Sequence, residues 1–208
     1  EVKLFCLRDH FGTKPFFYYI TDEGNLLCSG SIRNIIAGEG FKKELNRDML
    51  QIYMSLTYVG GEDTFFKGMK KLMPGHYLEF SNGKLEIHRY WKLLDREHKE
   101  NFEETCAHVR ELVLDAIQRQ MVSDVPIGTF LSGGLDSSLI SSVCAREMDK
   151  SGERLQTFSV DYVDHEKYFV PGKFQPNSDT YYINLMKETL DSDHHWTVLG
   201  PDDLVNAL

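Results

Sequence analysis

The chain has 208 residues, and its 23 Lys and Arg residues against 32 Asp and Glu residues give a formal net charge of −9. Its 41% hydrophobic and 26% charged residues are typical of a globular protein and exclude a disordered tail. Because nucleic acids and membrane surfaces attract basic proteins, the acidic balance predicts no nucleic-acid and no membrane partner. No apolar run in the sequence approaches the roughly 20 residues that a membrane-spanning helix needs.

The cysteines show neither a disulfide framework nor a zinc-site spacing. They lie far apart in the sequence, without a CxxC pair: Cys6, Cys28, Cys106 and Cys144. Reduced thiols are typical of the cytoplasm, where we expect the protein to be. The chain begins without Met in a strand-like run and stops at Leu208 within a predicted helix, so we expect a segment of a longer protein.

The first part of the chain is rich in predicted strands. Three β-branched or aromatic runs, separated by turns, predict an antiparallel meander: Glu1–Leu7, Pro15–Ile20 and Leu26–Ser29. A hairpin is strongly marked over His76–Phe80 and Lys84–Trp91. Asn82 and Gly83 between these runs supply the positive φ angles that a type I′ turn requires.

Two short helices are expected within this part, at Ser31–Ala37 and at Arg47–Leu56, the second with Asn46 as its N-cap. The predicted secondary structure then changes near Leu93–Glu100, from strands and turns to alternating helices and strands. We place a domain boundary there.

The second part begins with an amphipathic helix over residues 102–121, which carries Glu103 and Glu104 in its first turn. Short strands and helices then alternate along the chain: Ile127–Leu131, Ser137–Met148, Leu155–Val160, Ser178–Leu190 and His195–Leu199. This alternation predicts right-handed βαβ units, so the first two strands should be parallel neighbours. The polar, Pro-containing Asp161–Asn177 predicts a loop, and Ser178 is the expected cap of the helix after it.

The segment that carries chemistry is Ser132–Ser138, with the sequence Ser-Gly-Gly-Leu-Asp-Ser-Ser between a predicted strand and a predicted helix. Gly133 and Gly134 let the backbone approach a ligand, and the helix N-terminus offers N–H groups to an anion. The serine hydroxyls add donors, and Asp136 could hold Mg²⁺ beside a phosphate. The loop also follows a strand of a parallel sheet, where ligands bind in such folds. We therefore predict a phosphate-binding loop.

This loop differs from the commoner nucleotide and catalytic loops. Neither GxxxxGK[ST] nor GxGxxG occurs in the chain, and a GxSxG elbow fails because Phe130 stands two residues before Ser132. A purely structural alternative is a Gly-Gly turn with a serine cap. The strand before the loop and the Asp-Ser-Ser that opens the helix favour anion binding over that alternative.

Ser132–Ser138 resembles the pyrophosphate-binding loop of ATP pyrophosphatases. The residues before it, Val122–Gly128, resemble those of glutamine-hydrolysing asparagine synthetases. Three more segments resemble the same family in the same order: Arg8–Tyr18, Met73–Tyr77 and Tyr90-Trp91. Together these segments extend over nearly the whole chain.

The resemblance implies a fold that is α/β and α+β. Residues 1–93 would be the carboxyl-terminal part of an antiparallel-sheet, Ntn-type glutaminase domain with its connecting segment. Residues 94–208 would begin a parallel-sheet, Rossmann-like ATP pyrophosphatase domain, the ATP-binding synthetase domain of this family.

The resemblance also implies an activity. In this family aspartate reacts with ATP and Mg²⁺ to give β-aspartyl-AMP and pyrophosphate, and ammonia from glutamine then gives asparagine and AMP. Asp136 would hold Mg²⁺, while Leu131 and Val160 would contact adenine through their backbone. The phosphates would lie on the loop residues: Ser132, Gly133, Gly134, Asp136, Ser137 and Ser138. A homodimer is compatible with the resemblance, and no catalytic residue is assignable within the segment.

Two further features match the family less specifically. Asp179 corresponds to a family carboxylate, although an acidic residue that favours the helix N-terminus is an equal alternative. His194-His195 resembles a family His pair, and without other ligands at zinc spacing it does not predict a metal site.

The chain also departs from the family pattern. The amino-terminal Cys nucleophile of the family glutaminase has no counterpart, because neither Cys6 nor Cys28 begins the chain. We therefore expect no glutamine hydrolysis by these 208 residues alone. A later family segment, Gly-Glu-Gly-x-Asp-Glu, is absent too.

Two alternatives to an asparagine synthetase stay open. One is a related amidotransferase-like ligase of the β-lactam synthetase type, which adenylates a different carboxylate. The other is a non-catalytic paralogue that binds ATP as a sensor or scaffold. Pyrophosphate release that depends on aspartate would separate these three cases.

Overall fold

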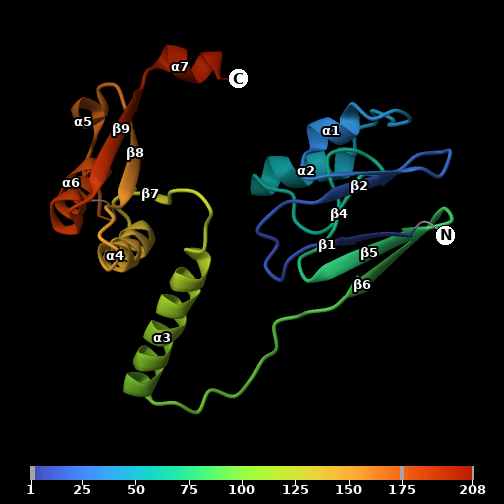
Figure 1. The fold of residues 1–208 in the computed structure, drawn as a ribbon. Coiled ribbons are helices and arrows are strands. Elements are labelled where there is room, and N and C mark those ends of the chain that lie inside the picture. The colour runs from blue at the N-terminus through green and yellow to red at the C-terminus, as the bar shows by residue number, and fades with distance from the viewer. Residues whose placement is uncertain (1–2, 174–175, 208) are drawn as a thin grey trace. The chain divides into compact units, whose positions relative to one another are not determined.

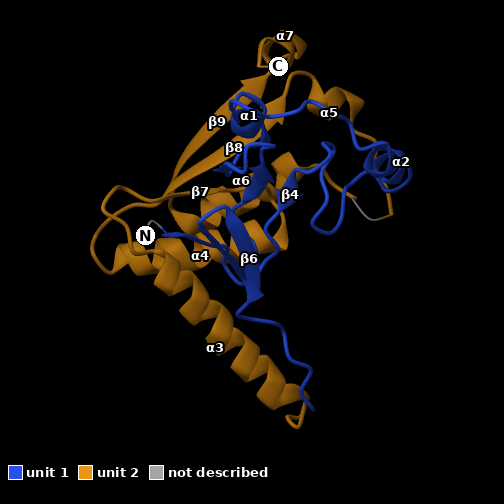
Figure 2. Cartoon of the chain, turned by 90° about the vertical axis from the view of Figure 1, so that its right-hand side faces the viewer, with its two compact units in different colours: residues 1–97 blue, residues 98–208 orange. Residues whose placement is uncertain are grey.

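The computed structural model describes residues 3–173 and 176–207, and the chain divides into two compact units, residues 1–97 and residues 98–208 (Figure 1 and Figure 2). The first unit contains, in chain order, β1 (Lys3–Leu7), β2 (Phe17–Ile20), β3 (Leu26–Ser29), α1 (Ile32–Ile36), α2 (Arg47–Leu56), β4 (Lys70–Lys71), β5 (His76–Ser81) and β6 (Lys84–Arg89). No helix within the described ranges is both long and apolar enough to cross a membrane.

The first unit has two antiparallel sheets, with strand orders β1-β5-β6 and β3-β2-β4. The predicted meander is only partly right, because β2 pairs with β3 whereas β1 pairs with β5. Between β1 and β2 the chain makes a compact turn: Asp9 accepts hydrogen bonds from Thr13, and the Arg8 guanidinium donates to the carbonyl of Leu72 at 2.6 Å. This turn leads the chain from one sheet to the other and prevents a β1–β2 hairpin.

The first unit has two buried clusters: Tyr19, Ile35 and Met69 form one beside α1, and the other lies where the two sheets pack together. Tyr18 of β2 and Leu78 of β5 are buried in this second cluster, and Cys6 of β1 packs against them. The Cys6 thiol is close enough to interact with the Cys28 thiol of β3, and burial together with that neighbour raises the pKa of Cys6. Two cysteines that are remote in the sequence are thus neighbours in the fold, both as free thiols.

Two elements of this unit that were predicted from short sequence motifs, a hairpin and a helix, are confirmed. The Asn82-Gly83 hairpin is confirmed, with φ angles of 50° and 73° at the two residues. Helix α2 has the predicted bounds, and the side chain of Asn46 accepts its cap hydrogen bond from the N–H of Met49. The first predicted strand begins at Lys3 in the described residues; its first two positions lie outside them.

The second unit contains α3 (Phe102–Gln120), β7 (Gly128–Phe130), α4 (Leu135–Asp149), β8 (Gln156–Tyr162), α5 (His165–Tyr168), α6 (Asp179–Leu190), β9 (Asp193–Leu199) and α7 (Pro201–Asn206). Its sheet has the order β7-β8-β9, and both pairs of strands are parallel, as the alternation predicts. Helix α4 packs against β7, α3 and α6. The carboxyl end of β7 therefore leads directly into the predicted loop.

Several expected bounds in this unit need correction. Helix α4 begins at Leu135 and not at Ser137, so Asp136 lies in its first turn. Strand β8 continues to Tyr162, and α5 follows it, so the expected loop Asp161–Asn177 contains regular structure. Positions 174 and 175 of that expected loop lie outside the described residues. The polar composition of this segment predicted a loop. Its regular structure is instead stabilised by hydrogen bonds between its polar side chains, which are described below.

Candidate phosphate-binding loop

The loop starts from a fixed point at the end of β7. The side chain of Leu131 is buried, and its N–H donates to the carbonyl of Phe158 on β8 at 2.8 Å. Its carbonyl accepts a hydrogen bond from the hydroxyl of Ser159, which is itself buried. The parallel neighbour β8 thus binds both the N–H and the carbonyl of the residue that precedes the loop.

Gly133 is the residue whose identity the loop geometry requires most clearly. Its φ of +79° belongs to the left-handed region, which glycine adopts without steric cost. A Cβ at this position would lie 2.7 Å from the carbonyl oxygen of Asp179 and 3.1 Å from Cβ of Tyr182. The backbone of the loop therefore runs directly against the first turn of α6.

Two serine hydroxyls close the loop from within. The Ser137 hydroxyl donates to the carbonyl of Gly134 at 3.1 Å and accepts from the N–H of Ser132 at 3.2 Å. The two serine oxygens, Oγ of Ser132 and Oγ of Ser137, lie 2.9 Å apart. These bonds fix the turn between β7 and α4, and they use donors that the sequence alone assigned to an external anion.

Asp136 lies on the exposed surface of the first turn of α4. The N-cap of that helix is Gly134, and no side chain caps it, so the serine cap of the purely structural alternative is not formed. An exposed carboxylate near hydroxyls fits Mg²⁺, which uses one or two protein carboxylates and takes its other ligands from substrate phosphates and water. The uncapped N-terminus of α4 adds a partial positive charge that favours an anion at the same place.

Of the residues assigned to adenine, Leu131 directly follows β7, and Val160 lies within β8, two residues before its end. Phe130 and Phe158 are in register, so Leu131 and Ser159 follow side by side and Val160 comes next along β8. Val160 is 49% exposed, whereas Leu131 is buried and has partners on both backbone groups. Of these two residues, Val160 is the more accessible to a ligand.

Asp179 and the histidine pair have separate positions. Asp179 opens α6, and its carbonyl is the atom that approaches Gly133. His194 and His195 are consecutive on β9 and so point to opposite faces of the sheet. Nδ1 of His194 is hydrogen-bonded to Thr157 at 2.8 Å, and Nε2 of His195 to Gln156 at 2.6 Å. The two rings therefore lie on opposite faces of the sheet and bond to different side chains.

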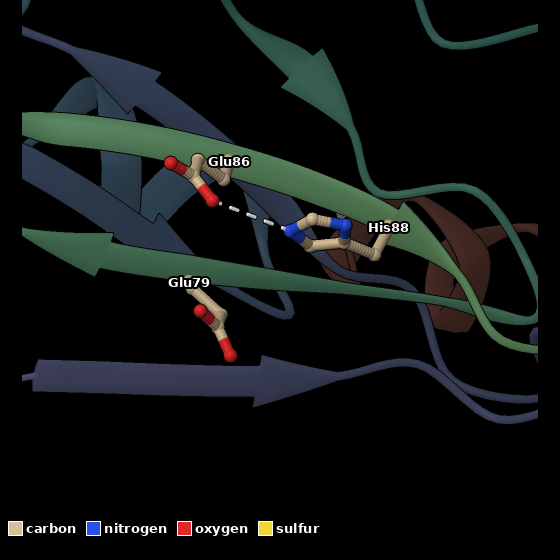
Figure 3. A group of neighbouring side chains, drawn as sticks. All are labelled: Glu79, Glu86 and His88. Atoms are coloured by element: carbon tan, nitrogen blue, oxygen red, sulfur yellow. Dashed lines mark ion pairs between the residues drawn. The ribbon is translucent and has the colours of Figure 1, made fainter.

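Among the described residues, one group of His and carboxylate side chains brings three ligand atoms close together, and it lies in the first unit and not at the loop. Glu79 of β5 faces Glu86 of β6 across the ladder, with His88 beside them (Figure 3). Glu79 already pairs with the Lys3 ammonium at 2.6 Å, and Nε2 of His88 lies 3.5 Å from Glu86. These ion pairs account for the group without a metal ion.

A polar network that the sequence analysis missed lies where β8 ends. Asp161 is partly buried and accepts hydrogen bonds from the N–H of Tyr162, from the His165 ring and from the Thr180 hydroxyl. Burial alone would raise the pKa of Asp161, but the hydrogen bonds to its carboxylate lower that pKa below its usual value. The only signal in the sequence was the unexplained density of polar residues in Asp161–Asn177.

Comparisons with known proteins agree with the order of the two units along the chain. The family description "Glutamine amidotransferase domain" matches residues 1–91, and the description "Asparagine synthase" matches residues 108–208.

Named relatives extend over most or all of the chain. The chain is 43% identical, over 99% of its length, to asparagine synthetase (glutamine-hydrolyzing) 3 of Bacillus subtilis, and 33% identical, over 99%, to asparagine synthetase (glutamine-hydrolyzing) 1 of that organism. It is 31% identical over 74% of its length to amidase chry2 of Gibberella zeae. The chain spans about a third of the length of the two Bacillus subtilis relatives, 34% and 30%. By these matches, the chain belongs to the glutamine-hydrolysing asparagine synthetase family.

Proposed function

We propose that the protein is an ATP-dependent, amide-forming ligase that makes asparagine from aspartate and glutamine-derived ammonia through a β-aspartyl-AMP intermediate. The observation that carries the proposal is the loop Ser132–Ser138 at the carboxyl end of a parallel sheet, within the residues that match the asparagine synthase description. Residues that match an amidotransferase description precede it. An ammonia-producing part and an ATP-using part would thus occur in one polypeptide.

The proposed division of labour follows the chain. Residues 1–93 would be the end of the glutaminase domain with its connecting segment, and residues 94–208 would begin the ATP-binding synthetase domain. We place the protein in the cytoplasm, where aspartate, glutamine and ATP are its proposed small-molecule partners. A homodimer belongs to the same proposal and rests on the family resemblance alone.

The loop residues would act by binding and orienting the phosphates of ATP. Backbone N–H groups at the start of α4 and its partial positive charge would face the phosphate oxygens. Mg²⁺, held by Asp136, would supply charge neutralisation for the pyrophosphate that leaves. Ser132 and Ser137 would keep the loop in shape through their internal hydrogen bonds and lie beside the phosphates, and Ser138 would offer its hydroxyl to the phosphate oxygens.

The nucleoside would occupy the adjacent strand ends. Val160, half-exposed on β8, would contact adenine through its backbone. The carbonyl of Leu131 accepts a hydrogen bond from Ser159 and keeps a second lone pair for a ligand donor. Holding adenine and phosphates on neighbouring strands would orient the α-phosphate toward the attacking carboxylate, which is a positioning effect.

The alternatives predict different reactions. A β-lactam synthetase-type ligase would release pyrophosphate with another carboxylate substrate and not with aspartate. An ATP-binding paralogue would bind ATP and release none. The relative named as an amidase shows that proteins similar to this chain carry more than one name.

The test uses the full-length protein that contains this chain, with ATP, Mg²⁺ and glutamine present. We expect pyrophosphate and AMP to appear only when aspartate is added, together with one asparagine for each AMP. A panel of other carboxylates serves as the control for the ligase alternative. Aspartate-independent pyrophosphate release, or ATP binding without any pyrophosphate, would reject the proposal.

A further inference from the structure

A partly buried carboxylate connects β8 to the helix that lies against the phosphate-binding loop. Oδ2 of Asp161 accepts a hydrogen bond from the Thr180 hydroxyl at 3.1 Å, and Thr180 is in the first turn of α6. Oδ1 of the same carboxylate accepts from Nδ1 of His165 at 2.7 Å and from the N–H of Tyr162 at 2.8 Å. Asp161 directly follows Val160, the exposed residue at the proposed adenine position.

A second tie holds the same end of α6. The hydroxyl of Ser178, the N-cap residue of α6, donates to Oε1 of Glu166 at 2.6 Å. Ser178 is the N-cap residue of α6, as the sequence predicted, but its side chain accepts no capping hydrogen bond. His165 and Glu166 both belong to α5, so this short helix is joined to β8 and to α6 by its consecutive side chains.

The first turn of α6 is also the surface on which the loop rests. The carbonyl of Asp179 lies so close to Gly133 that a single added carbon would be 2.7 Å from it. Asp179 is between the two tied residues, Ser178 and Thr180. A shift of this turn toward the loop would push Gly133, and a shift away would remove its support.

We propose that Asp161 and Thr180 are positioning residues: their hydrogen bond sets the place of the first turn of α6, and through it the conformation of the phosphate-binding loop. The inference rests on the proposed function, because the loop is the group being positioned. Neither residue needs to touch ATP. Their effect should therefore appear in nucleotide affinity and in the KM for ATP, with a smaller effect on the KM for aspartate.

The experiment compares two substitutions at Thr180 in the full-length protein. Thr180→Val keeps the shape and removes the hydroxyl, whereas Thr180→Ser keeps the hydroxyl. A hydrogen bond to a charged group makes a sizeable net contribution, so we expect the Val variant to bind Mg-ATP about tenfold more weakly and the Ser variant to remain near wild type. Titration calorimetry with Mg-ATP and the KM for ATP in pyrophosphate release are the two measurements.

Thr189→Val is the matched control. Thr189 lies on the same helix and its hydroxyl donates to the carbonyl of Leu185 at 2.8 Å, away from the loop. It should leave ATP affinity unchanged and so separate a general loss of α6 stability from loss of positioning. Equal ATP affinity in wild type and Thr180→Val, or an equal loss in Thr189→Val, would overturn the inference. Failure of the wild type to release pyrophosphate with aspartate would count against the proposed function instead, and the calorimetric comparison would still decide the inference.

Discussion

At the scale of single residues, Gly133 combines two constraints that are separable by mutation. Its backbone has a positive φ, and its missing Cβ leaves room for the carbonyl of Asp179. Gly152, just beyond α4, also has a positive φ, of 74°, but has open space where a Cβ would be. Comparing alanine substitutions at Gly133 and Gly152 therefore separates the effect of a steric clash from the effect of a positive φ angle.

We expect Gly133→Ala to weaken Mg-ATP binding by at least about tenfold, because the loop must move away from α6 to admit the methyl group. Gly152→Ala should lower the free energy of unfolding by only about 1 kcal/mol, the cost of a left-handed alanine, and leave ATP binding unchanged. Calorimetric titration and urea unfolding of both variants provide the comparison. Equal effects on ATP binding would mean that close approach to α6 is irrelevant.

His194 offers a prediction about pH. Its Nε2 is buried without a hydrogen-bond partner in the described part of the chain, and burial, with Lys187 and His195 nearby, lowers its pKa. The unfolded chain then binds a proton more readily than the folded one, so this term favours folding above the ordinary histidine pKa of about 6.5 and is lost as the pH falls below it. We expect the urea concentration at the midpoint of unfolding to decrease as the pH is lowered from about 7 to about 5.

The variant His194→Gln should flatten that dependence, since glutamine does not titrate. The wild type, unfolded in the same urea series at each pH, is the reference. An unchanged slope in His194→Gln would assign the pH dependence to other groups.

The thiols of Cys144 and Cys106 differ in burial and should differ in reactivity. Burial raises the pKa of the Cys144 thiol, so we expect Cys144 to be alkylated more slowly than the exposed Cys106.

At the scale of elements, sequence signals confined to a few neighbouring residues predicted structure well. The Asn82-Gly83 turn needs only its own two positive φ angles, and the start of α3 needs only the residues of its first turn. Pairing of β1 with β5 could not be predicted in the same way. It depends on a turn held by Arg8 to the carbonyl of Leu72, a residue 64 positions away.

The candidate site shows the same limit. The loop and the edge of the sheet on which it lies followed from its glycines, its serines and the alternation of strands and helices. Its support from α6 did not, because Gly133 meets Asp179 and Asp161 meets Thr180 only after the crossover is folded. The hydrogen bond from the Ser137 hydroxyl to the carbonyl of Gly134 could not be predicted either, because the sequence does not show which acceptor a hydroxyl will have.

The cap of α3 makes a testable contribution at this scale. Asn101 accepts a hydrogen bond from the N–H of Glu104 at 3.0 Å, and the Glu104 carboxylate accepts one from the N–H of Asn101 at 3.0 Å. Asn101→Ala should lower the free energy of unfolding by about 1 kcal/mol, the usual effect of losing a capping side chain, whereas Asn101→Asp should preserve it. Urea unfolding followed by far-UV circular dichroism would measure both. Equal stability of all three proteins would show that the reciprocal bonds contribute nothing.

At the scale of the whole molecule, the two units carry different chemistry in the proposed reaction. The amidotransferase match falls in the first unit, and Asp136 with its loop falls in the second. A change confined to Asp136 should therefore affect the use of ATP and leave the hydrolysis of glutamine in place. This asymmetry tests the division of labour and the metal role of Asp136 with one substitution.

In the full-length protein, Asp136→Asn should reduce aspartate-dependent pyrophosphate release by about 10²–10³, because asparagine cannot balance the charge of Mg²⁺ on the leaving group. The fold should be unaffected, since Asp136 is exposed and caps no helix. Asp149→Asn, at the exposed far end of α4, is the matched control and should retain full activity. Glutamine hydrolysis measured without ATP and aspartate should be the same in all three proteins. Turnover of Asp136→Asn within about threefold of wild type at saturating ATP and Mg²⁺ would remove Asp136 from the metal site. Parallel loss of glutamine hydrolysis would instead indicate that the substitution acts on both activities, against the proposed separation of the two units.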